Sequence, residues 1–340
     1  MGSITDEGHG WKTVLFCGPI DSPLNSGRYM AAAMEGLGYR VIGYDYRTNP
    51  RFEEDLPGIV EREKPTYVVT LKGEKLSPGL VEKFRRAGCV TILWFTMIPL
   101  EDWMTPLALA HDFVCTNVED HVEFFQRCGV RHVKWVHQGF APAFFGIGES
   151  GQNSPRQFHT DVAMIGSMGA PIYRTRCEMV MRLRREGIAV RWWGPRLSRQ
   201  LKNLPYFLGG VHRAWAGREV YMRDFAGVVR GTGIFIGQDA DLPVRGRSLS
   251  NRSLAVPGCG GFYLCRRTPG IEDAFRVGEE VAVFDTPDEM VEKVGYYLRN
   301  DGERRRIALA GQQRVLADYT YETQMGKIFA WVDSCHLMNA

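Results

Sequence analysis

The sequence predicts an α/β protein with two doubly wound domains, and three observations lead to this prediction. Its 340 residues suit two domains, since a domain usually spans about 100–200 residues. Short apolar runs of strand length alternate with amphipathic stretches that favour helices. Hydrophobic residues make up 44% of the chain and charged residues 24%, a composition that excludes a disordered or fibrous protein.

The first part of the chain repeats the order strand, loop and helix. Gly38 marks the end of the first predicted helix, because glycine readily ends helices. Strands that alternate with helices in this way form a parallel sheet that is covered on both faces. The predicted strands are residues 13–17, 39–45, 67–71, 90–95, 113–116 and 132–136, and the predicted helices are residues 28–37, 77–87 and 118–127.

A polar stretch rich in Gly, Ser and Asn, residues 146–155, interrupts this rhythm and predicts a domain boundary. The alternation then resumes. It predicts strands at 160–165, 189–193, 207–211, 234–236, 261–265 and 280–284, and helices at 174–185, 218–230, 251–257, 287–299, 302–317 and 319–332. We therefore expect Rossmann-like domains at 1–141 and 156–318, and a C-terminal segment at 319–340 that crosses back to the first domain.

Several classes of protein are disfavoured by the composition. No run reaches the roughly 18 consecutive apolar residues of a spanning helix, and the first ten residues are polar, so we expect no membrane span and a cytoplasmic location. The eight cysteines form no Cys-x-x-Cys pair and no group at metal spacing, so we expect reduced thiols.

Charge is spread unevenly between the two halves. Residues 1–140 hold 15 Lys and Arg against 18 Asp and Glu, whereas residues 141–340 hold 27 against 21. Of those 27 cations 24 are Arg, whose planar guanidinium binds phosphate oxygens in pairs. The second domain therefore suits a phosphorylated ligand, although an Arg-rich solvated surface has the same composition. The imbalance is too small to favour nucleic acid.

Loops after strands are the expected ligand sites, because open α/β sheets bind ligands beyond the carboxyl ends of their strands. Gly166 and Ser167 end one strand, and Arg174 and Arg176 open the next helix, a pattern typical of anion sites. The alternative is a tight turn that needs Gly for its backbone alone. With two such domains, we expect them to face each other across a cleft.

A second candidate anion site begins at Ser250, where a polar loop leads into a short helix. Ser250 or Asn251 is expected to cap this helix, which leaves free amides, including that of Ser253, beside Arg252. These groups suit a diphosphate, although Asn251 and Arg252 also fit a simple cap and a surface ion pair. Trp215, in the loop after the predicted strand 207–211, is a candidate for stacking on a flat ring, with interface packing as the alternative.

The segment that follows Ser250 resembles a known family. The chain is similar to the C-terminal domain of the spore-maturation-type (CgeB-like) glycosyltransferase-like proteins, which have the GT-B fold. The resemblance is densest over residues 234–330 and rests on the motifs Asn251–Gly261, Thr268–Glu272, Phe275–Glu280, Thr286–Met290, Tyr296–Asn300 and Arg306–Gly311, and more loosely on Asp161–Ser167 with Arg174 and on Gly73, Trp94, Thr116 and Gly129.

This resemblance implies a nucleotide-sugar donor held by the second domain, a hydroxyl acceptor held by the first, and transfer without a required metal or cofactor. Arg252 matches the family's arginine, and Glu272 is counted with the donor residues. Many retaining GT-B enzymes carry two glutamates eight residues apart, and Arg247 and Ala255 stand at those positions here. Asp239-Ala240-Asp241 has the Asp-x-Asp pattern of metal-dependent transferases of a different fold, but no third ligand accompanies it.

Sugar transfer needs cations for the leaving diphosphate and a proton acceptor for the attacking hydroxyl. We expect Asp21, in the first loop after a strand, to be the leading candidate for this base, followed by Glu74 and His137. Each also fits a structural role, as a turn residue, a solvated carboxylate and a hinge histidine respectively.

Three further interpretations stay open at this stage. A relative that binds nucleotide or glycan without transfer would explain the missing glutamates. A transferase acting on a macromolecule such as modified DNA is disfavoured by the acidic first domain. A nucleotide-sugar epimerase would convert its donor without any acceptor.

Overall fold

Parallel sheets form the centres of the two units into which the chain divides. A computed structural model describes residues 12–22, 26–96, 99–149, 154–239, 241 and 246–337. The first ten residues, Ala240 and residues 150–153 of the predicted boundary lie outside the described residues. No helix in the described ranges is both long and apolar enough to cross a bilayer. All eight cysteines are free thiols, and all but Cys128 are buried.

Unit 1 comprises Met1–Thr116, His121–Val136 and Met325–Ala340. Its six strands are all parallel, in the order β2-β1-β3-β4-β5-β6. The chain order therefore reverses direction between β1 and β3. The strands are β1 (Thr13–Cys17), β2 (Arg40–Tyr44), β3 (Tyr67–Leu71), β4 (Val90–Phe95), β5 (Phe113–Thr116) and β6 (Val133–Trp135).

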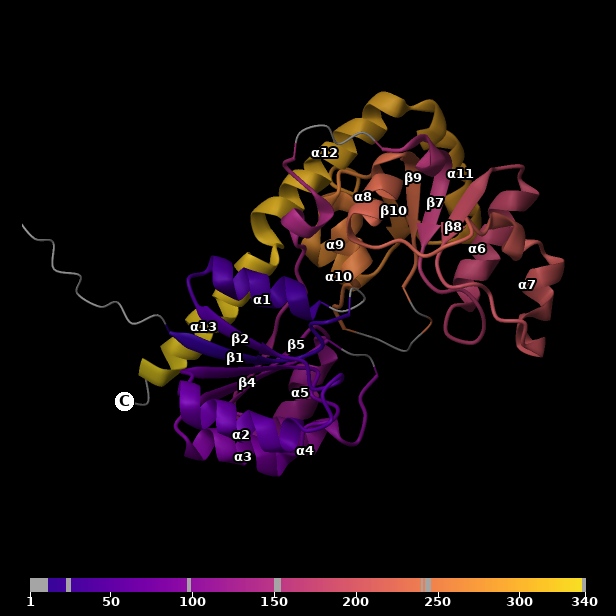
Figure 1. The fold of residues 1–340 in the computed structure, drawn as a ribbon. Helices are drawn as coiled ribbons and strands as arrows, with labels where there is room; N and C mark the ends of the chain where they lie inside the picture. The colour runs from indigo at the N-terminus through magenta and orange to yellow at the C-terminus, as the bar shows by residue number, and fades with distance from the viewer. Residues whose placement is uncertain are drawn as a thin grey trace, which may run out of the picture. The chain divides into compact units, whose positions relative to one another are not determined.

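Helices cover both faces of the unit 1 sheet (Figure 1). Side chains of α2, α3, α4 and α5 share one apolar core with the strands, and Leu56, Phe84, Met104 and Phe125 are fully or almost fully buried in it. The α1 and α13 helices lie on the other face, where Phe329 packs 4.4 Å from the ring of Tyr39. The helices are α1 (Gly27–Gly36), α2 (Phe52–Glu63), α3 (Pro78–Arg86), α4 (Met104–Ala110), α5 (Asp120–Arg127) and α13 (Tyr321–Leu337).

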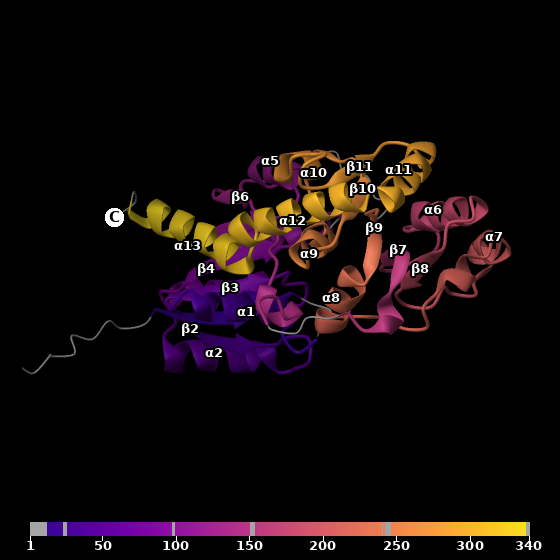
Figure 2. The same cartoon turned by 90° about the horizontal axis from the view of Figure 1, so that it is seen from above.

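Unit 2 comprises Asn117–Asp120 and His137–Gln324. Its five strands are also parallel, in the order β11-β10-β9-β7-β8, so the order reverses between β7 and β9. Figures 1 and 2 both show α6 and α7 beside the edge strand β8. The strands are β7 (Thr160–Ile165), β8 (Val190–Trp193), β9 (Thr232–Gly237), β10 (Tyr263–Arg266) and β11 (Ala282–Phe284).

One face of this sheet shares an apolar core with α6, α11 and part of α12. The helices α8 and α9 lie on the other face. The α-helices are α6 (Arg174–Arg185), α7 (Leu204–Leu208), α8 (Met222–Arg230), α9 (Asn251–Gly258), α10 (Pro269–Ala274), α11 (Pro287–Arg299) and α12 (Asp301–Asp318). Short 3-10 turns are η1 (Pro142–Phe145), η2 (Arg156–Phe158), η3 (Leu201–Asn203) and η4 (Val211–Ala214).

The two doubly wound parallel sheets confirm the predicted fold class. The predicted strand 207–211 is wrong, because Leu204–Leu208 is helical and Val211–Ala214 is a 3-10 turn. Pro205 stands in the first turn of that helix, where its missing amide proton costs nothing. The helix α2 was not predicted. Pro57 lies inside it, and Leu56 and Val60 are both buried on one face.

Candidate functional site

The loops at the reversal point of the unit 2 sheet bring together most of the predicted donor residues. Gly166 follows β7, and Gln238 and Asp239 follow its neighbour β9. The crevice beyond the carboxyl ends of two such strands is where open α/β sheets bind ligands. Arg176, from α6, and Arg252, from α9, both reach this point.

Gly166 and the two arginines are in close contact. A Cβ added to Gly166 would lie 2.7 Å from Nη2 of Arg252 and 3.1 Å from Nη1 of Arg176. The backbone carbonyl of Gln238 accepts hydrogen bonds from Nε of Arg176, at 2.7 Å, and from Nη1 of Arg252, at 3.2 Å. The Ser167 carbonyl accepts a further bond from Arg176, at 3.0 Å. Two guanidinium groups are thus held over one glycine by backbone carbonyls.

Arg176 is 6% exposed and carries its charge in a poorly solvated place. Burial, followed by repulsion from Arg252, lowers the pKa of Arg176 to about 9, and the Asp239 carboxylate opposes part of this change. The guanidinium is still charged at neutral pH. An anion bound between the two arginines would relieve their mutual repulsion, because it adds the opposite charge where solvent screening is weak.

The two residues after β9, which contact or lie near the arginines, each carry a buried acceptor atom that has no donor among the described residues. Within the described residues, the buried Oδ1 of Asp239 and Oε1 of Gln238 accept no hydrogen bond. Most buried polar atoms in proteins are satisfied, so such acceptors indicate a place where a ligand can donate. Hydroxyl groups are donors that suit both atoms.

An aromatic cavity of about 300 Å³ is lined in part by Trp192, which contacts Gly166. Nε1 of Trp192 donates to the carbonyl of Gly166 at 2.6 Å, and Nε1 of Trp215 donates to the carbonyl of Gly194 at 2.9 Å. Gly194 packs so closely that a Cβ there would lie 2.2 Å from the Gly166 carbonyl oxygen. The cavity is lined by Trp192, Arg196, Leu197, Arg199, Phe207, His212 and Trp215.

The start of α9 lies beside the arginines but is not capped as expected. Ser250 occupies the N-cap position and Asn251 is the first helical residue, yet the Ser250 side chain makes no capping hydrogen bond. Its hydroxyl instead contacts that of Ser253 at 3.2 Å, and Ser253 contacts the buried Tyr263 hydroxyl at 3.4 Å. Asn251 is exposed.

Two other predicted donor residues lie apart from this cluster. Arg174 is exposed, and its Nε lies 3.5 Å from Glu178 of the same helix. Glu272 lies in α10, where Oε1 accepts from Arg267 at 2.6 Å. The guanidinium of α6 that reaches Gly166 is that of Arg176, two residues after Arg174.

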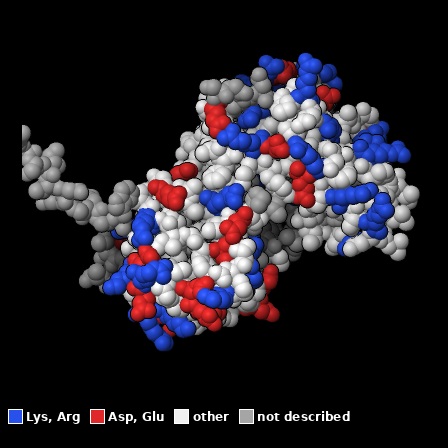
Figure 3. All heavy atoms as spheres, viewed as in Figure 1, with Lys and Arg blue, Asp and Glu red and all other residues white. Residues whose placement is uncertain are grey.

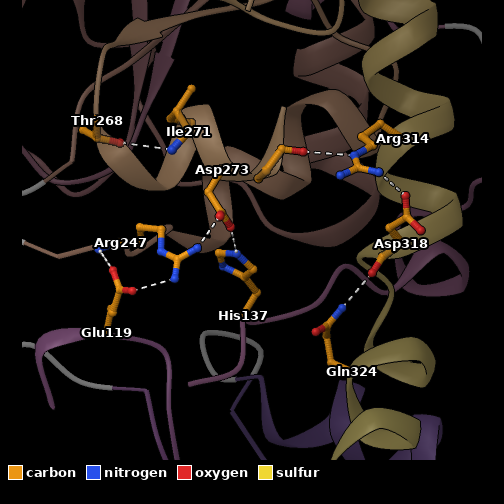
Figure 4. A network of polar contacts seen from close by, with 10 residues as sticks. Glu119, His137, Arg247, Thr268, Ile271, Asp273, Arg314, Asp318 and Gln324 are labelled. Carbon is orange, nitrogen blue, oxygen red and sulfur yellow. Dashed lines mark hydrogen bonds and ion pairs between the residues drawn. The ribbon is translucent and has the colours of Figure 1, made fainter. Parts of the chain in front are cut away.

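His137 belongs to a polar network within unit 2 (Figure 4). Its Nε2 lies 3.3 Å from Oδ2 of Asp273, whose Oδ1 accepts from Arg247 at 2.5 Å. Arg247 also binds Glu119 through its side chain, at 2.5 Å, and through its backbone amide, at 3.0 Å. These hydrogen bonds lower the pKa of Glu119 to about 2. Arg247 thus bridges two carboxylates, and Ala255 is buried in α9.

The remaining two predicted site residues lie in unit 1, at the reversal point of its sheet. Asp21 follows β1 and is exposed, and its Oδ2 accepts from the Thr48 hydroxyl at 2.9 Å. Glu74 follows β3 and accepts from the Tyr46 hydroxyl at 2.8 Å and from Arg47. Burial raises the pKa of Glu74, but the hydrogen bonds from Arg47 and Tyr46 outweigh it and lower the pKa overall.

The Asp-x-Asp motif is divided between different roles. Asp241 accepts from the Thr175 amide at 2.9 Å, at the first turn of α6, while Asp239 faces Arg176. Nowhere in the described ranges do three His, Cys, Asp or Glu side chains gather in a group that could hold a metal ion.

Sequence reasoning left Gln238 and Asp239 out of the donor site. Their roles depend on a backbone carbonyl and on unsatisfied acceptors, which no residue pattern records. The position of Gln238 in the loop after the predicted strand 234–236 was the available signal.

Part of the chain matches a known protein family, and most of it matches solved structures. Residues 174–330 match the family described as Glycosyl transferase-like. No curated protein gives a significant sequence match. Among solved structures, a glycosyltransferase from Rickettsia africae matches with a TM-score of 0.69 and 9% identity, over 95% of this chain and 98% of that one.

Two more solved structures are similar over almost the whole chain. Sucrose-phosphate synthase from Thermosynechococcus elongatus gives a TM-score of 0.64 at 9% identity, over 95% of this chain and 100% of that one. HepE from Anabaena, in complex with UDP and glucose, gives 0.65 at 11% identity, over 95% and 100% respectively. Such low identities establish the fold alone. The chain therefore has the GT-B fold, and its residues 174–330 are similar to the Glycosyl transferase-like family.

Proposed function

We propose that the protein transfers a sugar from a nucleoside-diphosphate donor, bound by unit 2, to a hydroxyl acceptor, without a metal ion. One observation carries the proposal: two guanidinium groups meet over Gly166 at the reversal point of a parallel sheet, beside an aromatic cavity. The leaving diphosphate needs its charge neutralised, and Arg176 and Arg252 supply two fixed positive charges there. These two charges would do for the leaving diphosphate what a bound divalent cation does in metal-dependent transferases.

The three parts of a nucleotide sugar fit three parts of this site. The diphosphate lies between the two arginines, and the base enters the cavity against Trp215. The sugar hydroxyls donate to Asp239 and Gln238, whose free acceptor atoms have no other donor among the described residues. UDP-hexoses are the first donors to test, because HepE binds UDP and glucose. Within the wider family we propose the spore-maturation type, on the motif Asn251–Gly261.

The acceptor hydroxyl needs a proton acceptor, and we assign this role to Asp21 in unit 1. Its carboxylate is exposed and is oriented by Thr48, whereas Glu74 is already engaged by Tyr46 and Arg47. Asp21 takes the hydroxyl proton as the acceptor oxygen bonds to the anomeric carbon. The bond from that carbon to the phosphate oxygen breaks, and the nucleoside diphosphate leaves with the electron pair. His137, with Asp273 at its Nε2, is the next candidate.

A turnover assay tests this function. Nucleotide sugars are incubated with the protein, with and without a panel of hydroxyl acceptors, and both nucleoside diphosphate release and sugar products are measured. We expect release that depends on the acceptor, and a strong reduction in Arg252→Ala. Arg182→Ala, on α6 but paired with Glu186 and Asp288, serves as the matched control.

Other outcomes separate the competing functions. Nucleotide binding without release under any acceptor would indicate a binding protein. A changed sugar on an intact nucleotide would indicate an epimerase. Either result would contradict the proposed transfer.

A further inference from the structure

Three leucines on one helical segment of unit 2 are exposed to solvent. Leu201 is 83% exposed, Leu204 48% and Leu208 80%. The turn η3 and the helix α7 follow one another without a gap, so spacings of three and seven residues place the leucines on one face. Single exposed leucines are common, but an aligned group indicates a surface that contacts something apolar.

The opposite side of the same segment is firmly attached to unit 2. Asn203 is 2% exposed; its Oδ1 accepts from the Ala170 amide at 2.9 Å, and its Nδ2 donates to the Ser198 carbonyl at 3.0 Å. Tyr206 is buried in the unit 2 core. The leucines are therefore presented on an anchored segment.

The surroundings of the leucines are strongly basic. Residues 187–218 contain six Lys and Arg and no Asp or Glu. Arg199, Lys202 and Arg213 are exposed, and none of them forms an ion pair with any residue the structure describes. Figure 3 shows Lys and Arg gathered over the end of unit 2 that α6 and α7 form.

We propose that this leucine face, defined by Leu201, Leu204 and Leu208 with the neighbouring cations, binds the surface of an anionic phospholipid bilayer. The leucines enter the boundary between headgroups and acyl chains while the cations contact the headgroups. A second copy of the same face would bring cations against cations. A nucleic acid would satisfy the cations but leave the leucines in water. An anionic bilayer satisfies both.

Vesicle sedimentation with the full-length protein tests the inference. One set of vesicles is made of phosphatidylcholine, and the other of phosphatidylcholine mixed with anionic phosphatidylglycerol. We expect binding to the anionic vesicles only, and weaker binding at high salt because the charges are exposed. Leu201→Ser with Leu208→Ser is expected to lower the partition coefficient at least about tenfold. Lys202→Gln with Arg213→Gln is expected to lower it about 30-fold.

Matched variants elsewhere control for general loss of hydrophobicity or charge. Leu109→Ser with Leu309→Ser removes two other exposed leucines, and Arg86→Gln with Arg131→Gln removes two exposed cations of unit 1. Both are expected to bind like the wild type. All these side chains are exposed, so every variant is expected to fold, and unfolding curves verify this.

Three results would overturn the inference. The first is equal or absent binding to the two kinds of vesicle. The second is unchanged binding by the leucine variant. The third is a dimer, measured by light scattering, that the same leucine variant converts to a monomer. None of these depends on nucleotide or transfer activity, so failure here leaves the proposed function untouched.

Discussion

Arg252 lies against the backbone of Gly166, so that Nη2 would be 2.7 Å from a Cβ at that position. Gly166 also has a φ of +132°, which L residues rarely adopt. Gly166→Ala is therefore expected to lower the free energy of unfolding by about 1–3 kcal/mol and to weaken nucleoside diphosphate binding by displacing the arginine. Denaturant unfolding and calorimetric titration measure the two effects.

Gly187→Ala separates strain from displacement. Gly187 has a φ of +73°, and a Cβ there would have open space. This variant is expected to lose stability while it keeps nucleotide affinity. Loss of affinity in both variants would mean that Gly166 acts through stability alone.

Substitutions of two arginines on α6 compare the donor residue predicted from the sequence, Arg174, with the one that lies beside Gly166, Arg176. Arg176→Met keeps the apolar stem but removes the charge beside Arg252, so nucleotide affinity is expected to fall by about 1.5–3 kcal/mol. Arg174→Met removes an exposed side chain that pairs with Glu178, and a smaller effect is expected. Titration calorimetry on folded variants measures both. A larger loss of nucleotide affinity in Arg174→Met would indicate that the anion binds at the start of α6, near Arg174, and not beside Arg176.

The proposed base predicts a split between binding and turnover. Asp21→Asn is expected to leave donor affinity nearly unchanged and to lower kcat by about 10²–10⁴. Glu74→Gln breaks the contacts with Tyr46 and Arg47 and is expected to affect stability more than kcat. Undiminished kcat in Asp21→Asn would exclude it as the base and direct attention to His137→Gln.

His111 in unit 1 predicts a dependence of stability on pH. Burial lowers its pKa from 6.5 to about 4, despite a 2.8 Å hydrogen bond from Nδ1 to the Leu107 carbonyl. Because the unfolded chain binds this proton more readily, stability is full above pH 6.5 and falls as pH drops towards 4, by up to about 3 kcal/mol.

The check on His111 is urea unfolding between pH 4 and pH 7. His111→Asn is expected to be less stable at neutral pH. Its free energy of unfolding is also expected to depend less on pH, by the contribution of about one bound proton. A slope unchanged by the substitution would show that other groups cause the acid sensitivity.

The sequence predicted the architecture because strand and helix periodicities record burial directly. The positions of Gly166, Ser167 and Arg252 were likewise predictable, since they stand where strands end and helices begin, while their role in donor binding stays a prediction. The sequence did not show that Arg176, and not Arg174, would reach Gly166. Arg176 reaches it because of the side of α6 on which it lies, although Arg174 is nearer to the strand in sequence. The Arg247 bridge to Glu119 and Asp273 joins residues far apart in the chain, and nothing local records it. The wrong strand at 207–211 arose because an apolar run of that length suits either structure.

In the proposed complex, Arg176 and Arg252 hold the diphosphate of a nucleoside diphosphate, and its base lies against Trp215. A thermal-shift panel tests it most directly, since a ligand of the native state raises stability by RT ln(1 + [L]/Kd). Nucleoside diphosphates are expected to raise the Tm of the wild type more than inorganic diphosphate or nucleosides do. Arg252→Ala is expected to reduce the shift from both diphosphates, and Trp215→Ala only the additional shift from the base. No shift with any nucleoside diphosphate, or an equal shift in Arg252→Ala, would contradict the account.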